Sequence, residues 1–200
     1  MKQKLVLASN NAGKLREFGQ LLAEIDFEVL PQSAFNVPEA EEPYVTFVEN
    51  ALTKARHCAR LTGLPALADD SGLCVPSLGG APGVHSARYA SLGTNQPKSD
   101  ARNSAHLLAQ LEGNTDRRGH YVAVLVFVRH ADDPQPLIAE GEWHGEILTA
   151  PRGEGGFGYD PLFFIPELNA TAAELPAERK NAFSHRGMAL RQLIEKLKRQ

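Results

Sequence analysis

Residues 4–30 place a segment of helical periodicity between two short apolar runs, and this order restricts the fold more than any other feature. Residues 4–8 form a compact apolar run suited to a buried strand, and residues 27–30 form a second one. A strand, a helix and a strand in this order predict an α/β fold with a helical crossover and parallel pairing. The apolar positions on the helix face are Leu15, Phe18, Leu21, Leu22 and Ile25.

The rest of the chain adds long extended runs. Residues 121–128 and 137–147 are strand-like, and the loop 129–136 between them suits an antiparallel hairpin. The central sheet is therefore expected to be mixed, with flanking helices. Without a repeat or a low-complexity segment, residues 1–200 are predicted to form one compact unit with two lobes. Further helices are expected at 46–61, at about 100–111 and around residues 189–197, and a further strand at 162–165.

Composition excludes several classes of protein. A hydrophobic share of 42% in 200 residues supports a sizeable core. The longest apolar run, residues 122–128, is too short to span a bilayer, and the N-terminus does not resemble a secretory signal. Cys58 and Cys74 are isolated, which fits a reducing compartment, and a net charge of −3 without a basic run disfavours a nucleic-acid duplex. We expect a cytoplasmic protein with no membrane or nucleic-acid partner.

Two adjacent carboxylates follow the apolar run at residues 66–68. Asp69 and Asp70 are expected where a buried strand ends, and because side chains alternate along a strand, only one of them can face a given ligand. Like charges this close favour a divalent cation beside them. An acidic surface turn is the alternative, but the glycine-rich run at 79–83 permits close approach of a ligand.

The polar loop at residues 9–14 joins the first strand to the first helix. Backbone N–H groups and the positive end of the helix dipole would point at an anion there, and Lys14 adds a positive charge. The loop lacks the P-loop pattern, and simple capping of the helix explains it equally well. Lys54 and Arg56 lie two positions apart on a later helix, so at most one of them can serve the same site.

A second glycine-rich run occupies residues 153–161. Glycines on both sides of Phe157 leave its ring accessible for stacking on a planar base, and Asp160 supplies a hydrogen-bond acceptor nearby. A turn that buries Phe157 in the core is the alternative.

The last helix begins at a cluster of polar residues. Ser184 is a candidate N-cap, and His185 and Arg186 follow it in the first turn. Cationic or donor groups are unfavourable next to the positive end of a helix, which indicates an anionic or carbonyl-bearing ligand opposite them.

Six short motifs lie in order along nearly the whole chain. They are SNNAGK (9–14), TFVENA (46–51), ADDSGL (68–73), GGAPG (79–83), GGFGYDP (155–161) and SHRG (184–187). Taken together, they resemble the inosine triphosphate pyrophosphatase family, and within it the bacterial enzymes that act on non-standard purine nucleoside triphosphates, the dITP/XTP pyrophosphatases. One departure is Ser9-Asn10, where many relatives have Thr-Gly.

The resemblance implies both a fold and an activity. The fold is an elongated α/β structure with a long mixed sheet, two lobes around an active-site cleft, and a homodimeric assembly. The activity is Mg²⁺-dependent hydrolysis of ITP, dITP and XTP to the monophosphate and pyrophosphate, which keeps deaminated purines out of DNA and RNA.

The resemblance also implies residue roles. Asp70 would bind Mg²⁺ and orient or deprotonate the attacking water, with Glu41 as a second metal ligand and Glu42 as its less favoured neighbour. The triphosphate would be held by Ser9, Asn10, Asn11, Ala12, Gly13, Lys14 and Ser71. The purine nucleoside would be held by Phe157, Gly158, Tyr159, Asp160, Lys180, His185 and Arg186.

Three other functions fit parts of the sequence. An aspartate-nucleophile phosphatase would use the paired aspartates, but it needs an Asp-x-Asp arrangement that is absent here. A non-catalytic nucleotide sensor would bind without turnover. A pyrophosphatase of the same fold acting on modified pyrimidine triphosphates is disfavoured by the motifs at 155–161 and 184–187.

Overall fold

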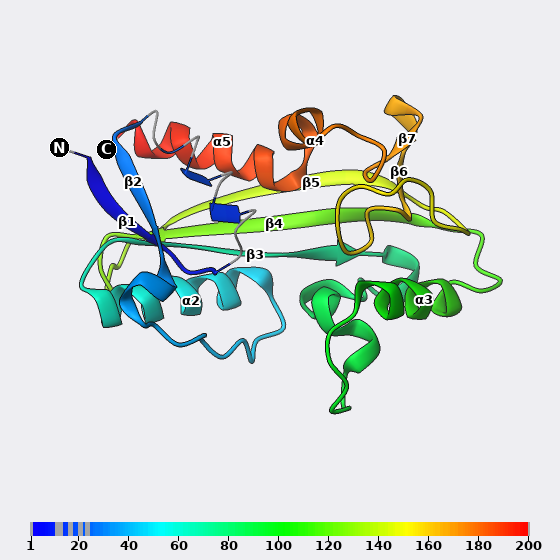
Figure 1. The fold of residues 1–200 in the computed structure, drawn as a ribbon, viewed down its shortest axis with the longest axis horizontal. Helices are drawn as coiled ribbons and strands as arrows, with labels where there is room; N and C mark the ends of the chain where they lie inside the picture. The colour runs from blue at the N-terminus through cyan, green and yellow to red at the C-terminus, as the bar shows by residue number, and fades with distance from the viewer. Residues whose placement is uncertain (1, 11–13, 16–17, 20–21, 23–24, 200) are drawn as a thin grey trace. The chain divides into compact units, whose positions relative to one another are not determined.

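A computed structural model of the chain contains a mixed seven-stranded sheet among the residues that it describes, which are 2–10, 14–15, 18–19, 22 and 25–199 (Figure 1). The strand order is β2-β1-β3-β4-β5-β6-β7. Strand β1 pairs in parallel with β2 and β3, whereas β6 pairs antiparallel with β5 and β7. The strands are β1 (Gln3–Leu7), β2 (Phe27–Pro31), β3 (Ala66–Cys74), β4 (Arg118–Val128), β5 (Leu137–Ile147), β6 (Phe163–Ile165) and β7 (Ala170–Thr171).

Helices accompany the strands, which confirms the α/β class. The described residues Lys14, Leu15, Phe18, Gly19 and Leu22 are helical, and with the parallel β1–β2 pair they confirm the predicted crossover; Leu21 lies outside the described residues. The later helices are α2 (Phe47–Thr62), α3 (Asp100–Gln110), α4 (Ala177–Phe183) and α5 (His185–Leu197), with 3-10 segments η2 (Gln32–Phe35), η3 (Pro76–Leu78), η4 (Gly83–Ser91) and η5 (Pro166–Leu168). No helix in the described part of the chain is long and apolar enough to cross a membrane.

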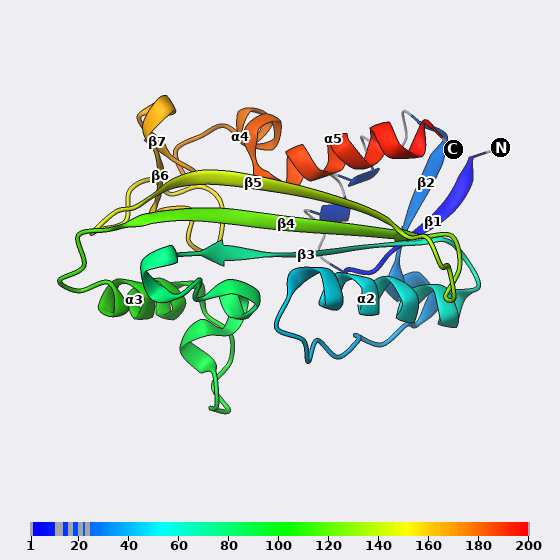
Figure 2. The same cartoon turned by 180° about the vertical axis from the view of Figure 1, so that it is seen from behind.

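The chain divides into two compact units. Unit 1 comprises residues 1–70, 123–140 and 188–200, and unit 2 comprises residues 71–122 and 141–187. In unit 1, helices α2 and α5 lie on opposite faces of the sheet (Figures 1 and 2). The core of unit 1 includes Leu5, Leu7, Phe18, Leu22, Leu67, Leu125, Phe127, Leu190 and Leu193.

Unit 2 has an aromatic cluster of its own. The ring centroid of Phe163 lies 4.7 Å from that of Tyr121 and 5.5 Å from that of Trp143. All three rings are buried, and Leu73 and Leu107 of the same unit are fully buried. Burial of these large side chains supplies the main stabilisation of unit 2.

Two strand boundaries expected from the sequence are wrong. Strand β3 does not end before the aspartates but continues through Asp69, Asp70 and Ser71 to Cys74, and β4 begins at Arg118 rather than at Tyr121. Helix α4 and strand β7 were not expected. Polarity marks a strand end only when the polar side chains need water, and in β3 the Asp69 carboxylate instead finds a partner within the protein.

Candidate functional site

A lysine joins the carboxylates of unit 1. The Nζ atom of Lys54, on α2, lies 2.5 Å from Oε1 of Glu42 and 3.2 Å from Oδ1 of Asp70. It also donates a hydrogen bond of 2.9 Å to the backbone oxygen of Asp69. Thr46 caps α2 by accepting from the Glu49 amide, and this cap fixes the start of the helix that carries Lys54.

The carboxyl group of Asp70 is largely shielded from water. Burial raises its pKa, the Lys54 ammonium opposes that rise, and the nearby carboxylate of Glu42 adds to it. Burial alone would lower the pKa of Lys54, but the attraction of Asp70 and Glu42 outweighs it and raises the pKa. Lys54 therefore remains protonated beside a carboxyl group that binds a proton more readily than an exposed aspartate.

Asp69 and Asp70 have different partners, as the alternation along a strand requires. The Asp69 side chain is buried and accepts a hydrogen bond from the Nζ atom of Lys14, on the first helix. This ion pair links the end of the 9–14 loop to β3. In the same loop Ser9 is half-buried, and the Oδ1 atom of Asn10 accepts from the amide of Ser33. The predicted ligands Asn11, Ala12 and Gly13 lie outside the described residues.

The described carboxylates of unit 1 could supply one or two ligands to a Mg²⁺ ion that takes its remaining ligands from elsewhere. No group of three or more His, Cys, Asp or Glu side chains among the described residues is arranged to hold a metal by itself. Mg²⁺ commonly takes only one or two carboxylates and completes its shell with phosphate oxygens and water. Asp70 and Glu42 meet at Lys54, and Oδ2 of Asp70 is buried without a hydrogen-bond partner in the described part of the chain.

In unit 2 the ring of Phe157 is exposed. Its residue exposure is 61%, so the alternative in which it packs into the core is wrong. Gly156 and Gly158 have φ angles of +75° and +63°, a left-handed conformation that favours glycine. The Nζ atom of Lys180 lies 4.8 Å from the ring centroid, so a cation stands over one side of the ring.

A buried network surrounds Asp160, which is 3% exposed. One carboxylate oxygen, Oδ2, accepts from the Nζ of Lys180 at 2.5 Å and from the amide of Phe157 at 2.8 Å. The other, Oδ1, accepts from the hydroxyl of Tyr121 at 3.4 Å. The Tyr121 ring stacks on His185 with centroids 4.8 Å apart and an interplanar angle of 10°. Burial raises the pKa of Tyr121 well above its usual value, so its hydroxyl remains a donor.

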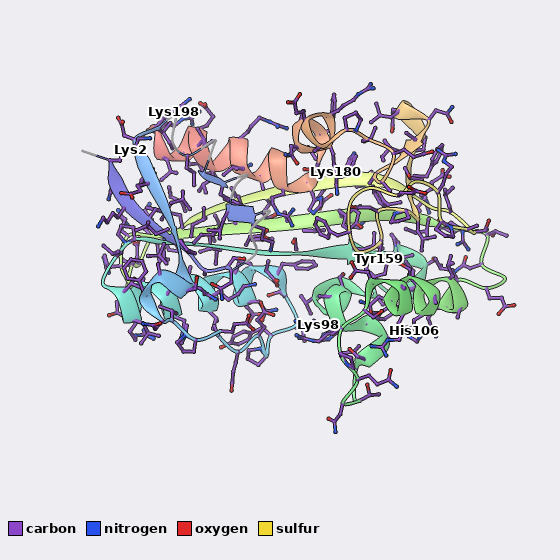
Figure 3. All side chains as sticks on the ribbon, viewed as in Figure 1. Lys2, Lys98, His106, Tyr159, Lys180 and Lys198 are labelled. Carbon is purple, nitrogen blue, oxygen red and sulfur yellow. The ribbon has the colours of Figure 1, made fainter. Side chains whose placement is uncertain are left out.

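The start of α5 brings the SHRG motif beside β3. Ser184 accepts from the amide of Gly187 at 3.2 Å, which confirms it as the helix cap. Arg186 donates from Nη2 to the hydroxyl oxygen of Ser71 at 3.2 Å. His185 and Arg186 are both mostly buried. Tyr159 is buried as well, and its hydroxyl donates to the backbone oxygen of Ser86 at 2.8 Å. Lys180 and Tyr159 are labelled in Figure 3.

The predicted residues thus fall into two groups. Within unit 1, Lys14 pairs with Asp69, and Lys54 pairs with both Asp70 and Glu42. Glu41, the favoured metal ligand of the sequence analysis, is exposed. Within unit 2, Ser71, Phe157, Asp160, Lys180, His185 and Arg186 are linked through the contacts given above.

Two residues of these networks carried too little sequence signal to be assigned. The spacing of Lys54 and Arg56 allowed only one of them to face the site, but it did not say which one. The structure places Lys54 beside the carboxylates, whereas Arg56 donates to the backbone oxygen of Asp133 at 3.4 Å. Tyr121 looked like an ordinary strand residue, and only its stacking on His185 distinguishes it. No local sequence pattern predicts a contact between Tyr121 and His185, which are 64 positions apart.

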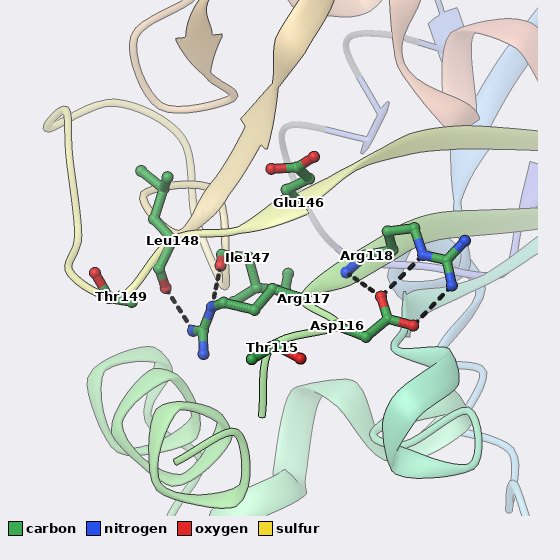
Figure 4. Close-up of a pocket in the computed structure, with 8 residues that line it drawn as sticks. All are labelled: Thr115, Asp116, Arg117, Arg118, Glu146, Ile147, Leu148 and Thr149. Atoms are coloured by element: carbon green, nitrogen blue, oxygen red, sulfur yellow. Dashed lines mark hydrogen bonds and ion pairs between the residues drawn. The ribbon is translucent and has the colours of Figure 1, made fainter. Parts of the chain in front are cut away.

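A separate pocket of unit 2 contains none of the predicted site residues (Figure 4). Its lining includes Arg117, which donates to the backbone oxygens of Ile147 and Leu148, and Arg118, which pairs with Asp116. These cations are occupied by the protein itself, so the pocket offers no distinct chemistry.

Known proteins resemble the chain over nearly its whole length. A dITP/XTP pyrophosphatase of Ralstonia nicotianae is 64% identical over 196 residues, covering 98% of this chain and 97% of that protein. One of Aromatoleum aromaticum is 65% identical over 197 residues, covering 98% of both. A solved HAM1 protein from Coxiella burnetii superposes with a TM-score of 0.93 at 48% identity, covering 99% of this chain and 100% of that one. The model of the Ham1 family matches residues 5–196, and with these relatives it shows that the chain belongs to the Ham1 family.

Proposed function

We propose that residues 1–200 form one nucleoside triphosphate pyrophosphatase domain that hydrolyses ITP, dITP and XTP to the monophosphate and pyrophosphate. The relatives named dITP/XTP pyrophosphatase support this substrate class at 64 and 65% identity. The observation that carries the chemistry is the half-buried carboxyl group of Asp70, held by Lys54 and followed directly by Ser71. A carboxylate with a raised pKa is suited to accept a proton.

The residues of unit 1 are proposed to handle the triphosphate and its metal. The 9–14 loop and Lys14 would meet the phosphates, and Asp70 would hold Mg²⁺ together with a glutamate. The contact of Glu42 with Lys54 favours Glu42 over Glu41 for this role. When bound, Mg²⁺ supplies positive charge for the leaving pyrophosphate and lowers the pKa of bound water.

Asp70 is proposed to orient the attacking water and take its proton. The water oxygen forms a bond to the α-phosphorus, the bond to the oxygen bridging to the β-phosphorus breaks, and pyrophosphate leaves with the electron pair. The positive charge of Lys54 favours the ionised form of Asp70 and so opposes the rise in pKa that burial causes.

The residues of unit 2 are proposed to recognise the purine. Phe157 would stack on the base, and Asp160, Lys180, His185 and Arg186 would meet its polar edge. A donor opposite the 6-keto oxygen accepts hypoxanthine or xanthine but meets the amino group of adenine donor to donor. Sites built on such hydrogen bonds reject the wrong group by about 10⁴-fold. GTP shares the 6-keto group, so its rejection must depend on position 2.

The wider context of the enzyme is proposed from the same resemblance. The protein would act as a homodimer in the cytoplasm and remove deaminated purine nucleotides before a polymerase incorporates them. Purine triphosphates would be its ligands, with neither a nucleic acid nor a membrane as partner.

A panel of nucleoside triphosphates tests the proposal. The purified protein is incubated with ITP, dITP, XTP, ATP, GTP and a modified pyrimidine triphosphate, each with Mg²⁺ and with EDTA, and pyrophosphate and orthophosphate are measured separately. We expect pyrophosphate only, from the first three substrates and only with Mg²⁺. Release of orthophosphate would indicate a phosphatase, and binding without turnover would indicate a nucleotide sensor. A preference for the modified pyrimidine triphosphate would indicate a pyrophosphatase of the same fold with a different substrate class.

A further inference from the structure

The exposed ring of Phe157 is positioned by its backbone. Because most of the ring is in water, packing contributes little to fixing it. Its two glycine neighbours also leave the chain a wide range of alternative conformations. A ring that must meet a planar base in one orientation therefore needs restraints on its own peptide groups.

Asp160 supplies the first restraint. Its Oδ2 atom accepts from the amide of Phe157 at 2.8 Å and is itself held by Lys180. The carboxylate is buried, and a Cβ atom placed on Gly156 would lie 2.1 Å from the same oxygen. The chain can approach the carboxylate this closely only because residue 156 has no side chain.

Asp100 supplies a second restraint from a different element. Its Oδ2 atom accepts a hydrogen bond of 2.7 Å from the amide of Gly158, and Ser104 donates to the backbone oxygen of the same glycine at 3.4 Å. Asp100 and Ser104 are four positions apart on α3 and so lie on one face of that helix. A hydrogen bond of this length to a carboxylate belongs to the stronger, charge-assisted class.

Helix α3 is a firm base for this contact. Asn103 is 3% exposed, accepts from the amide of Ala90 at 2.9 Å and donates to the backbone oxygen of Ala87 at 3.1 Å. Leu107, one turn later, is fully buried. A site residue held on a packed helix is more precisely placed than one held by a loop alone.

We propose that Asp100 is a positioning residue for purine binding: with Asp160 it fixes the two consecutive amides at Phe157 and Gly158, and so presents the Phe157 ring to the base. This inference rests on the proposed function of Phe157 and extends it to a residue outside all six motifs. Fixing the ring before the substrate arrives removes an ordering penalty from binding. The effect belongs to substrate affinity and leaves the hydrolytic step unchanged.

The kinetic test compares Asp100→Ala, Asp100→Asn and the control Glu112→Ala, an exposed carboxylate after the other end of α3. We expect Asp100→Ala to raise the KM for ITP about 10-fold with kcat within about twofold, since a hydrogen bond to a charged group is lost. Asp100→Asn keeps an acceptor oxygen and should restore most of the affinity. The alternative is that Asp100 only stabilises α3, through the attraction of its negative charge to the positive end of the helix dipole. Both variants would then lower the Tm alike and leave KM unchanged, which would overturn the proposal.

A double variant asks whether Asp100 acts through Phe157. In the Phe157→Ala background, Asp100→Ala should change KM by less than about twofold, because the ring that it positions is already gone. Equal 10-fold effects in both backgrounds would overturn the positioning role.

Amide hydrogen exchange tests the contact without substrate. We expect the Gly158 amide to exchange about 10-fold faster in Asp100→Ala than in the wild-type protein. Unchanged exchange would contradict the restraint itself. If the wild-type protein released no pyrophosphate from ITP, the proposed function would fail, whereas faster Gly158 exchange would still show that Asp100 fixes this loop.

Discussion

At the scale of single residues, the neighbouring carboxylates Asp69 and Asp70 differ in role because they differ in partner. Asp69 is paired with Lys14, and Asp70 shares Lys54 with Glu42. Asp70 also has one buried oxygen without a partner among the described residues. Of the two, Asp70 is the one whose cation is shared with a second carboxylate, the pair proposed to take part in metal binding.

Replacing Asp70 by Asn should separate catalysis from stability. The amide has nearly the same shape but cannot accept the proton of water, so we expect kcat for ITP to fall at least about 100-fold. Glu42 still neutralises Lys54, so the Tm should change by only a few degrees. Asp132→Asn, in an exposed loop, is the control. Near-normal turnover in Asp70→Asn would remove Asp70 from the mechanism.

The thiol of Cys58 should make the protein less stable in alkali. Burial raises its pKa from 9.0 to about 11. Below pH 9 the thiol is protonated in both states, and as the pH rises toward 11 only the unfolded chain ionises. The free energy of unfolding should therefore fall across this window, by at most about 3 kcal/mol. Urea titrations of the wild-type protein and of Cys58→Ala at pH 8 to 11 measure the free energy of unfolding. If this free energy fell equally with pH in both proteins, the Cys58 thiol would not be the cause.

At the scale of elements, periodicity located most helices and strands well. The limits of β5 match the predicted run, and α2 and α3 match to within one residue at each end. Short elements such as α4 and β7 were missed, because seven and two residues give no readable period. Lys180 on α4 is nevertheless one of the residues proposed to meet the base, so an element too short to be read from the sequence contributes to the proposed base site.

His185, at the start of α5, should control discrimination between ITP and ATP. Its ring is held parallel to Tyr121, which fixes the direction of its polar atoms. We expect His185→Ala to lower the ratio of kcat/KM for ITP over ATP at least about tenfold, because the side chain proposed to donate to the 6-keto oxygen is lost. The exposed His144→Ala is the matched control. If the ratio of kcat/KM for ITP over ATP did not change, His185 would have no part in this discrimination.

At the scale of the whole molecule, each unit is assembled from stretches distant in the sequence. The core of unit 1 joins β1 side chains such as Leu5 and β4 side chains such as Leu125 to Leu190 and Leu193 of α5. The framework that carries Lys14, Lys54 and Asp70 therefore depends on the last helix of the chain.

A substitution in that helix should test this dependence. Leu190→Ala removes a fully buried side chain and should lower the free energy of unfolding by about 2–5 kcal/mol. Arg191→Ala, on the exposed side of α5, should change it by less than about 0.5 kcal/mol. Chemical denaturation measures both values. Equal effects of the two variants would show that the α5 face does not stabilise the core.

Periodicity and short motifs predicted the longer helices and strands, the mixed sheet and the family, because both can be read from the chain without knowing its contacts. The folded arrangement, by contrast, was needed to show that Asp69 pairs with Lys14, that Glu42 contacts Lys54, and that the ring of Tyr121 stacks on His185. The contact of Asp100 with Gly158 likewise joins residues 58 positions apart. Such pairings depend on how packed helices and strands bring distant side chains together, and no local pattern encodes that distance.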